Sequence, residues 1–176
     1  LIKFFTFNPI GENTYLLYNE SKDCIIIDPG CYFEEENEKL KDFITQNQLN
    51  PTQLLNTHCH LDHVFGNKMV AETYQLTLQI HEKEKVVLSF APTSGLVYNL
   101  PFDSYEGDFI LLKEGDTLLL GQDELKVIEV PGHSPGSICF YCAKQHFLIG
   151  GDVLFQGSIG RTDLPLGDHE TLLHHI

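Results

Sequence analysis

The sequence lacks any apolar run of the roughly 18 residues that a membrane-spanning helix requires, so no membrane span is expected. It is also poor in basic residues, with 11 Lys and Arg against 25 Asp and Glu and a formal net charge of −14. This excess of negative charge argues against nucleic acid and against an anionic membrane as partners. The five cysteines are odd in number and irregularly spaced, which excludes a disulfide framework and favours a reducing, cytoplasmic location.

The chain has no initiating methionine, and its apolar start, residues 1–5, is too short and wrongly flanked for a signal peptide. We therefore expect a chain that has been trimmed at its front. Neither an internal repeat nor a low-complexity segment divides the 176 residues, and this length suits one domain with a substantial core. We predict a single domain over residues 1–176, and the composition predicts no particular oligomeric state.

Four side chains that can bind a metal ion fall within the stretch HCHLDH at residues 58–63, directly after an apolar run typical of a buried strand. Residues two apart on an extended backbone point to the same side, so His58 and His60 are expected to aim into one site. Asp62 and His63 follow where the chain turns into a helix, and they can face the same cavity. Imidazole and carboxylate at this density predict a site for zinc or a similar first-row metal.

The remaining sequence alternates short apolar strands with amphipathic segments, so we expect two packed sheets flanked by helices. Residues 91–108 carry several prolines and glycines and are predicted to form a long loop or lid at the substrate site. From residue 109 the pattern predicts successive strands joined as hairpins, with turns at residues 115–116 and 121–123. The predicted strands cover residues 3–7, 13–18, 24–27, 54–57, 78–80, 109–112, 117–120, 125–130, 138–141 and 147–149. The predicted helices cover residues 35–48, 64–75, 82–89 and a segment that begins near His169.

Two further ligand candidates follow apolar strands. His133 lies in a rigid turn of prolines and glycines, residues 131–136, which leaves its side chain little freedom. Asp152 follows a strand and two glycines, which allow a close approach of the backbone, and a carboxylate at this tip can bridge two cations. Arg161, in the glycine-rich loop 157–163, is predicted to bind a substrate carboxylate, with a structural salt bridge as the alternative role.

Cys139 and Cys142 have the CxxC spacing of redox and zinc sites. Both lie in an apolar run with the character of a strand, where residues three apart face opposite sides, so we predict core or sheet positions instead. Cys59 lies between two predicted ligands but points the other way. It is therefore also predicted to be a core residue.

These segments together resemble the metallo-β-lactamase superfamily over nearly the whole chain. The motifs that carry the resemblance are Thr57-His58-Cys59-His60-Leu61-Asp62-His63, Pro131-Gly132-His133 and Gly151-Asp152. The resemblance implies an α/β (α+β) fold, an αββα sandwich with the site at one edge of the two sheets. Features similar to the glyoxalase II (hydroxyacylglutathione hydrolase) branch and related small hydrolases are Asn13-Thr14-Tyr15, Asp28-Pro29-Gly30 and Gly160-Arg161-Thr162-Asp163.

The resemblance implies two zinc ions per chain, with iron or manganese as alternative metals. The matching positions are His58, His60 and His133 for the first metal, Asp62 and His63 for the second, and Asp152 as the bridging carboxylate. The family pattern also has a late histidine in a Gly-His-Gly turn, and this chain ends at Ile176 without it. We therefore expect a chain truncated at its C-terminus that lacks the last strand and helix of the sandwich. His169, His174 and His175 are expected to lie in the helix before that turn and not to be ligands.

The implied activity is zinc-dependent hydrolysis of a small-molecule acyl thioester by a hydroxide held between two metals, which Asp62 helps to orient. A thiolate, whose parent pKa is about 8.5, leaves without a strong general acid, so thioester or ester hydrolysis is favoured over lactam hydrolysis. The main alternative is a persulfide dioxygenase with one iron held by His58, His133 and Asp152. Further alternatives are a lactonase, a phosphodiesterase and a non-catalytic domain with structural metals.

Overall fold

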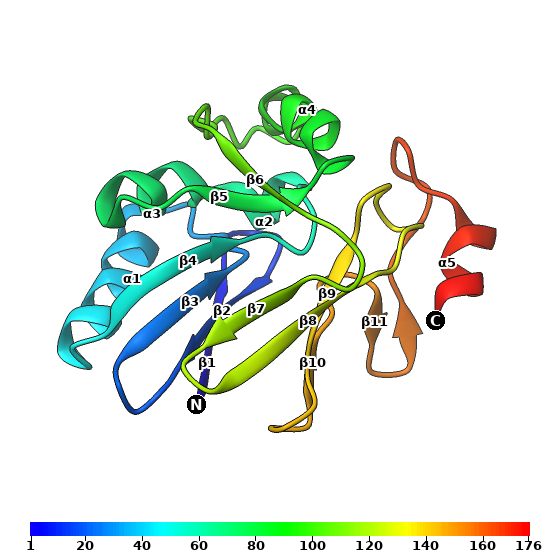
Figure 1. The fold of residues 1–176 in the computed structure, drawn as a ribbon. Coiled ribbons are helices and arrows are strands. Elements are labelled where there is room, and N and C mark those ends of the chain that lie inside the picture. The colour runs from blue at the N-terminus through cyan, green and yellow to red at the C-terminus, as the bar shows by residue number, and fades with distance from the viewer.

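The computed structural model describes residues 1–176 and shows two packed sheets with helices on their outer faces (Figure 1). The strands are β1 (Ile2–Phe7), β2 (Glu12–Tyr18), β3 (Asp23–Ile27), β4 (Asn50–Leu55), β5 (Leu78–His81), β6 (Phe109–Leu112), β7 (Thr117–Leu120), β8 (Asp123–Glu129), β9 (Ile138–Cys142), β10 (Phe147–Ile149), β11 (Leu154–Phe155) and β12 (Ser158–Ile159). The helices are α1 (Glu34–Gln46), α2 (Leu61–Val64), α3 (Asn67–Tyr74), α4 (Glu84–Val97) and α5 (His169–His175).

The first sheet holds six strands in the order β1-β2-β3-β4-β5-β6, and the second holds four in the order β10-β9-β8-β7. Strands β1 to β3 pair antiparallel, whereas β3 to β6 pair in parallel. The carboxyl ends of parallel strands meet at one edge of a sheet, so the segments after β3, β4 and β5 emerge side by side. The predicted site lies at this edge.

Alternating side chains of the inner strands fill two separate cores. In β3, Ile26 packs against the helices outside the first sheet, whereas Ile25 packs between the two sheets. In β4, Leu54 likewise packs against the helices and Leu55 packs between the two sheets. A third, smaller cluster that contains Leu172 of α5 lies on the outer side of the second sheet. These layers form the expected αββα sandwich.

Helix α4 contradicts the predicted loop at residues 91–108. The helix runs from Glu84 to Val97 and contains Pro92, although a proline in a helix interior removes one backbone hydrogen bond. Its buried face belongs to the large core outside the first sheet, and this packing outweighs the local cost. The irregular segment begins only after the helix ends.

The predicted helix over residues 64–75 is instead two helices, α2 and α3, with a break at Phe65 and Gly66. The amide of Gly66 donates to the carbonyl oxygen of Pro29 at 2.7 Å. A Cβ atom on Gly66 would lie 2.4 Å from the sulfur of Cys31, so the chain can approach the β3–α1 segment only with glycine here. This contact ends α2 after a single turn.

Strand β6 also differs from its predicted place. The expected succession of hairpins would pair β6 with β7, but β6 pairs in parallel with β5 and completes the first sheet. Strands β7 and β8 do form the expected hairpin. The turn at Gly115 and Asp116 therefore carries the chain from one sheet to the other.

The cysteine predictions are confirmed. Cys139 packs in the outer cluster with α5, whereas Cys142 packs between the two sheets, so their side chains face opposite sides of β9. Cys59 belongs to the core outside the first sheet. All five cysteines are buried and free of disulfide bonds.

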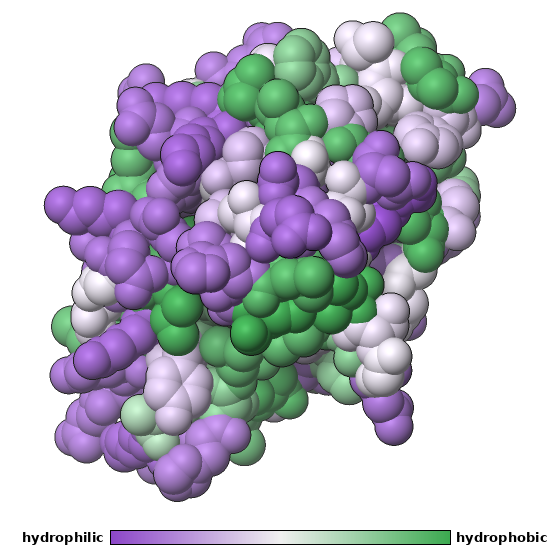
Figure 2. Space-filling model, turned by 90° about the vertical axis from the view of Figure 1, so that its right-hand side faces the viewer, coloured by the Kyte–Doolittle hydropathy of each residue, from purple (hydrophilic) through white to green (hydrophobic).

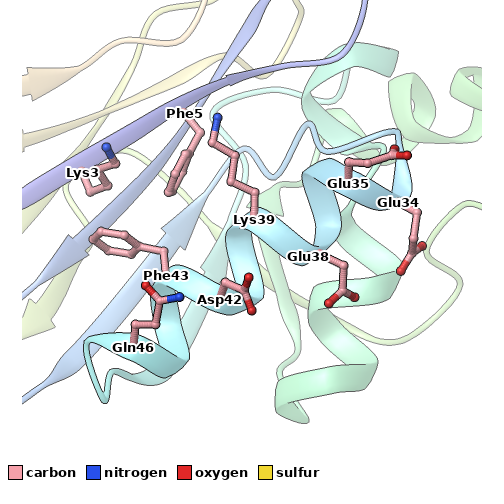
Figure 3. A pocket seen from close by; sticks show the side chains of 9 residues that line it. All are labelled: Lys3, Phe5, Glu34, Glu35, Glu38, Lys39, Asp42, Phe43 and Gln46. Atoms are coloured by element: carbon pink, nitrogen blue, oxygen red, sulfur yellow. The ribbon is translucent and has the colours of Figure 1, made fainter.

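Acidic residues dominate the first turn of α1, where Glu34 and Glu35 are exposed to solvent. Glu36 is half-buried and accepts hydrogen bonds from the amides of Asn8 and Tyr32, at 2.8 Å each. An open cleft between β1 and α1 lies beside Glu34 and Glu35 and contains Lys39 among several carboxylates (Figure 3). The face seen from the side of α5 mixes hydrophobic and hydrophilic areas (Figure 2). None of the helices combines the length and the apolar character that crossing a membrane would take.

Candidate metal centre

Two loops bring three histidines together at the edge where the parallel strands end. His58 and His60 lie in irregular chain between β4 and α2, and His133 lies between β8 and β9. The Nε2 atom of His133 is 2.9 Å from Nδ1 of His60 and 3.1 Å from Nε2 of His58. Ring nitrogens this close together can share one cation.

Hydrogen bonds around this cluster fix which nitrogen of each imidazole ring carries the proton. The unprotonated nitrogen of each ring then faces the site. Nδ1 of His133 lies 2.7 Å from the carbonyl oxygen of Arg161, which can only accept, so Nδ1 carries the proton and Nε2 the lone pair. Nδ1 of His58 lies 3.1 Å from the hydroxyl of Thr57, which donates its own proton to Asp28. His58 Nδ1 is therefore also a donor, and its Nε2 keeps a lone pair. Both rings are held with an unprotonated nitrogen facing the site.

A fourth imidazole and two carboxylates lie beside the three histidines. Nε2 of His63 is 3.4 Å from Oδ1 of Asp152 and 3.6 Å from Oδ2 of Asp62. The other oxygen of Asp152 is 3.7 Å from Nε2 of His133, so this carboxylate faces both halves of the site. The buried Nε2 of His63 has no hydrogen-bond partner, which fits a role in binding a cation.

Asp28 anchors both halves from behind, although it was not among the predicted site residues. Its Oδ2 accepts from the hydroxyl of Thr57 at 2.6 Å and lies 3.1 Å from Nδ1 of His63. Its Oδ1 accepts from the amide of Thr57 at 2.7 Å and from the side chain of Asn56 at 3.2 Å. The sequence signal was an Asp at the end of an apolar strand before Pro-Gly, the same kind of placement that pointed to Asp152.

Glu84, at the start of α4, ties the two histidine loops together and was also missed. Its Oε2 accepts from the amide of Cys59 at 2.7 Å, and its Oε1 accepts from the hydroxyl of Ser134 at 2.6 Å and from the amide of Gly136 at 2.7 Å. Its side chain is buried, whereas a Glu in the first turn of a helix is normally interpreted as a solvated partner of the helix dipole. Only the fold shows which residues it contacts.

Burial keeps the three clustered histidines neutral. It lowers the pKa of His58 well below its usual value and the pKa of His60 to about 3, and neighbouring imidazoles add to both effects. Burial also lowers the pKa of His133. Neutral imidazole is the form that binds metal, so this half of the site needs no deprotonation to do so.

The other half of the site is charged. Burial by itself lowers the pKa of His63, but the carboxylates of Asp62 and Asp28 raise it well above its usual value. Burial by itself raises the pKa of Asp152, but the nearby His63 and His133 bring it below its usual value. These carboxylates therefore favour positive charge beside them, on an imidazolium or on a bound cation.

The site opens into a cavity of about 620 Å³, and four of the six predicted ligands line it. Arg161 lines the cavity too, but its guanidinium donates to both carboxylate oxygens of Asp163, at 2.7 and 2.8 Å. The ion pair favours the structural alternative for Arg161, whose carbonyl oxygen also orients His133. The histidines of α5 belong to none of the potential ligand groups.

The residues present fit a pair of first-row metal ions. One group of potential ligands is His58, His60 and His133, and a second is His58, His63 and Asp152, with Asp62 beside the second. Nitrogen and oxygen donors of this kind are those that zinc and iron take in proteins. The geometry therefore brings together all six predicted ligands.

Residues 8–176 match a family model described as the metallo-beta-lactamase superfamily. The chain belongs to this superfamily. Together with the His and Asp cluster, membership identifies the protein as a metal-dependent hydrolase that binds divalent metals. The αββα sandwich agrees with this placement.

Two curated relatives are similar over most of their length. "Probable metallo-hydrolase YqgX" of Bacillus subtilis is 37% identical over 170 residues, which cover 96% of this chain and 78% of the relative. "Hydroxyacylglutathione hydrolase GloC" of Haemophilus influenzae is 36% identical over 167 residues, which cover 94% of this chain and 77% of the relative.

Two solved structures share the fold closely. BLEG-1 B3 metallo-beta-lactamase has a TM-score of 0.88 and 37% identity, covering 99% of this chain and 83% of that chain. TTHA1623 in a di-iron-bound form has a TM-score of 0.88 and 32% identity, covering 98% of this chain and 83% of that chain. One close structural neighbour thus carries the name of a lactamase, and another holds two irons.

Proposed function

We propose that the protein is a zinc-dependent hydrolase of acyl thioesters. The observation that carries the proposal is the paired ligand set, three inward-facing imidazoles beside His63 and Asp152, at the end of an open cavity. The name of the H. influenzae relative, a hydroxyacylglutathione hydrolase, supports a thioester as the substrate.

His58, His60 and His133 would hold the first zinc ion, and His63 with Asp62 the second, with Asp152 between them. When bound, the two ions supply an activated water and polarise the carbonyl group of the substrate. Asp62 would contribute a carboxylate that orients this water; its side chain is largely buried and lines the cavity. Asp28 and Thr57 hold His63 and His58 in the tautomers that this arrangement requires.

The cavity suits a leaving group that departs without a proton. A thiol with a pKa of about 8.5 leaves as a thiolate, whereas an amide nitrogen must be protonated first. No lysine lines the cavity, and its one arginine is paired with Asp163. The absence of a lysine ammonium group from this lining supports a thioester over a lactam as the proposed substrate.

Elemental analysis combined with a thioester hydrolysis assay tests the proposal. We expect two zinc ions per chain and metal-dependent turnover, and we expect His60→Ala to lose metal and at least a hundredfold in kcat/KM. His174→Ala is the matched control, because His174 is exposed in α5 and belongs to no ligand group.

Two results would contradict the proposal. Absence of thioester hydrolysis by the metal-loaded protein would remove the activity. A single iron per chain, together with oxygen uptake in the presence of a persulfide, would assign the site to a dioxygenase instead.

A further inference from the structure

The cavity at the site is a groove with one long apolar wall. Val87, Phe90, Ala91 and Val97 of α4 line it, together with Tyr98 at the C-cap of the helix, so one side of the helix forms this wall. Leu164, which precedes α5, lines the groove as well. In Figure 1, α4 and the segment that leads into α5 both lie on the side of the molecule where the histidine loops open.

Large hydrophobic side chains in this groove are left in contact with solvent. Phe90 is 51% exposed, Val97 is 78% exposed, and Leu166 from the other wall is 51% exposed. Such side chains can lose their contact with water when an apolar ligand lies between them, which is favourable. The groove is continuous with the predicted metal ligands, because His60 and Asp152 line the same cavity.

The charge of the lining is unsuited to an anionic ligand. Arg161 is its one basic side chain, and that guanidinium already donates to both oxygens of Asp163. The two carboxylates of the lining, Asp62 and Asp152, are the predicted metal ligands, and the chain as a whole carries a net charge of −14. The glutathione half of a thioester brings two carboxylates, and apart from the proposed metal ions the lining offers no unpaired cationic side chain for them.

We infer that this groove binds a hydrophobic acyl chain, so that the substrate is a thioester of a medium-length aliphatic acid and the acyl chain, not the thiol, carries the specificity. The biological carrier thiols are polar, so the apolar part of a thioester is its acyl chain. The inference rests on the proposed hydrolase function, because it places the carbonyl carbon at the metal ligands and the chain along α4.

Kinetics with a series of N-acetylcysteamine thioesters tests the inference, since the thiol is neutral and constant while the acyl group varies from acetyl to octanoyl. Complete burial of each added methylene is worth about fourfold in kcat/KM. The groove is partly open, so we expect a rise of at least tenfold from acetyl to octanoyl. S-lactoylglutathione should be a poorer substrate than the octanoyl thioester.

A matched pair of variants on α4 locates the effect. Val97→Asp places a charge on the groove wall and should lower the ratio of octanoyl to acetyl kcat/KM by at least tenfold. Val86→Asp places the same charge on the same helix at an exposed position that does not line the groove, and it should leave the ratio unchanged.

A flat response to chain length, or a tenfold preference for S-lactoylglutathione, would overturn the inference while leaving the hydrolase function intact. The ethyl and octyl thioethers of N-acetylcysteamine cannot be hydrolysed. Calorimetric titration with them therefore measures binding in the groove without turnover. If the octyl compound binds more tightly than the ethyl compound, and Val97→Asp removes this difference, the groove binds the acyl chain even if no thioester is hydrolysed. Equal binding of the two compounds contradicts it.

Discussion

Replacing Glu84 with Gln tests whether the two histidine loops are held together by one buried carboxylate. The substitution keeps the size of the side chain and removes one of its two acceptor oxygens. If the remaining oxygen still accepts the hydrogen bonds from Ser134 and Gly136, the new NH2 group faces the backbone N–H of Cys59. Two donors then face each other, and the hydrogen bond from Cys59 is lost. Cys59 is fully buried, so water cannot replace the lost acceptor.

The magnitude follows from these contacts. The loss of one hydrogen bond to a charged group costs roughly 1.5–3 kcal/mol, and the two bonds that remain weaken because they are no longer assisted by charge. Burial raises the pKa of Glu84, so removal of its charge recovers part of that desolvation cost. We expect a net loss of about 3 kcal/mol, which corresponds to a fall in Tm of roughly 6–12 °C for a chain of this size.

Metal affinity should fall with stability, because Cys59 lies between His58 and His60, and Ser134 follows His133. Loss of a group that supports metal ligands from behind typically costs about tenfold or more in affinity. Thermal unfolding of the metal-free protein and zinc titration against a competing chelator measure the two effects separately.

Glu82→Gln is the control, since Glu82 is exposed two residues earlier and its substitution makes the same change in charge. Equal unfolding temperatures for Glu84→Gln and Glu82→Gln would contradict this role of Glu84. If stability falls but zinc affinity does not, Glu84 supports the core and not the ligand geometry.

Two further results are expected from the same geometry. A Cβ atom on Gly160 would lie 1.7 Å from the carbonyl oxygen of Asp152, so Gly160→Ala should cost about 2 kcal/mol or more in urea unfolding. Gly150→Ala, whose Cβ would meet nothing closer than 4.0 Å, is the control and should change stability by less than about 1 kcal/mol. Chelation of bound metal should lower Tm, since a ligand at a hundred times its Kd stabilises the fold by about 2.7 kcal/mol. An unchanged Tm in calorimetry, with complete metal removal verified, would argue against cations bound only by the folded state.

The ligand cluster could be recognised in the sequence because most of its members sit next to one another or at the ends of apolar strands. His58, His60, Asp62 and His63 are neighbours in the chain, so their density is visible without a fold. His133 and Asp152 each follow an apolar strand and a Pro/Gly or Gly-Gly turn, which the structure confirms as β8 and β10. The continuous apolar run of residues 24–27 likewise indicated a strand, and the structure shows that both faces of this strand are buried.

The tertiary structure alone decided what lies behind and beside these residues. Glu84 contacts Cys59 and Gly136, which lie 25 and 52 residues away in the chain, and Asp28 contacts Thr57 across 29 residues. Neither carboxylate has a local pattern that reveals its partners, because hydrogen bonds of this range depend on which strands become neighbours in the sheet. The sequence also favoured a loop at Pro92 and a hairpin at β6, where long-range packing outweighed the local preference for a break or a turn. The metal-binding residues could therefore be predicted from the sequence. The hydrogen bonds that support the ligands, and the apolar wall of the groove, form only when the parallel strands and α4 have packed together.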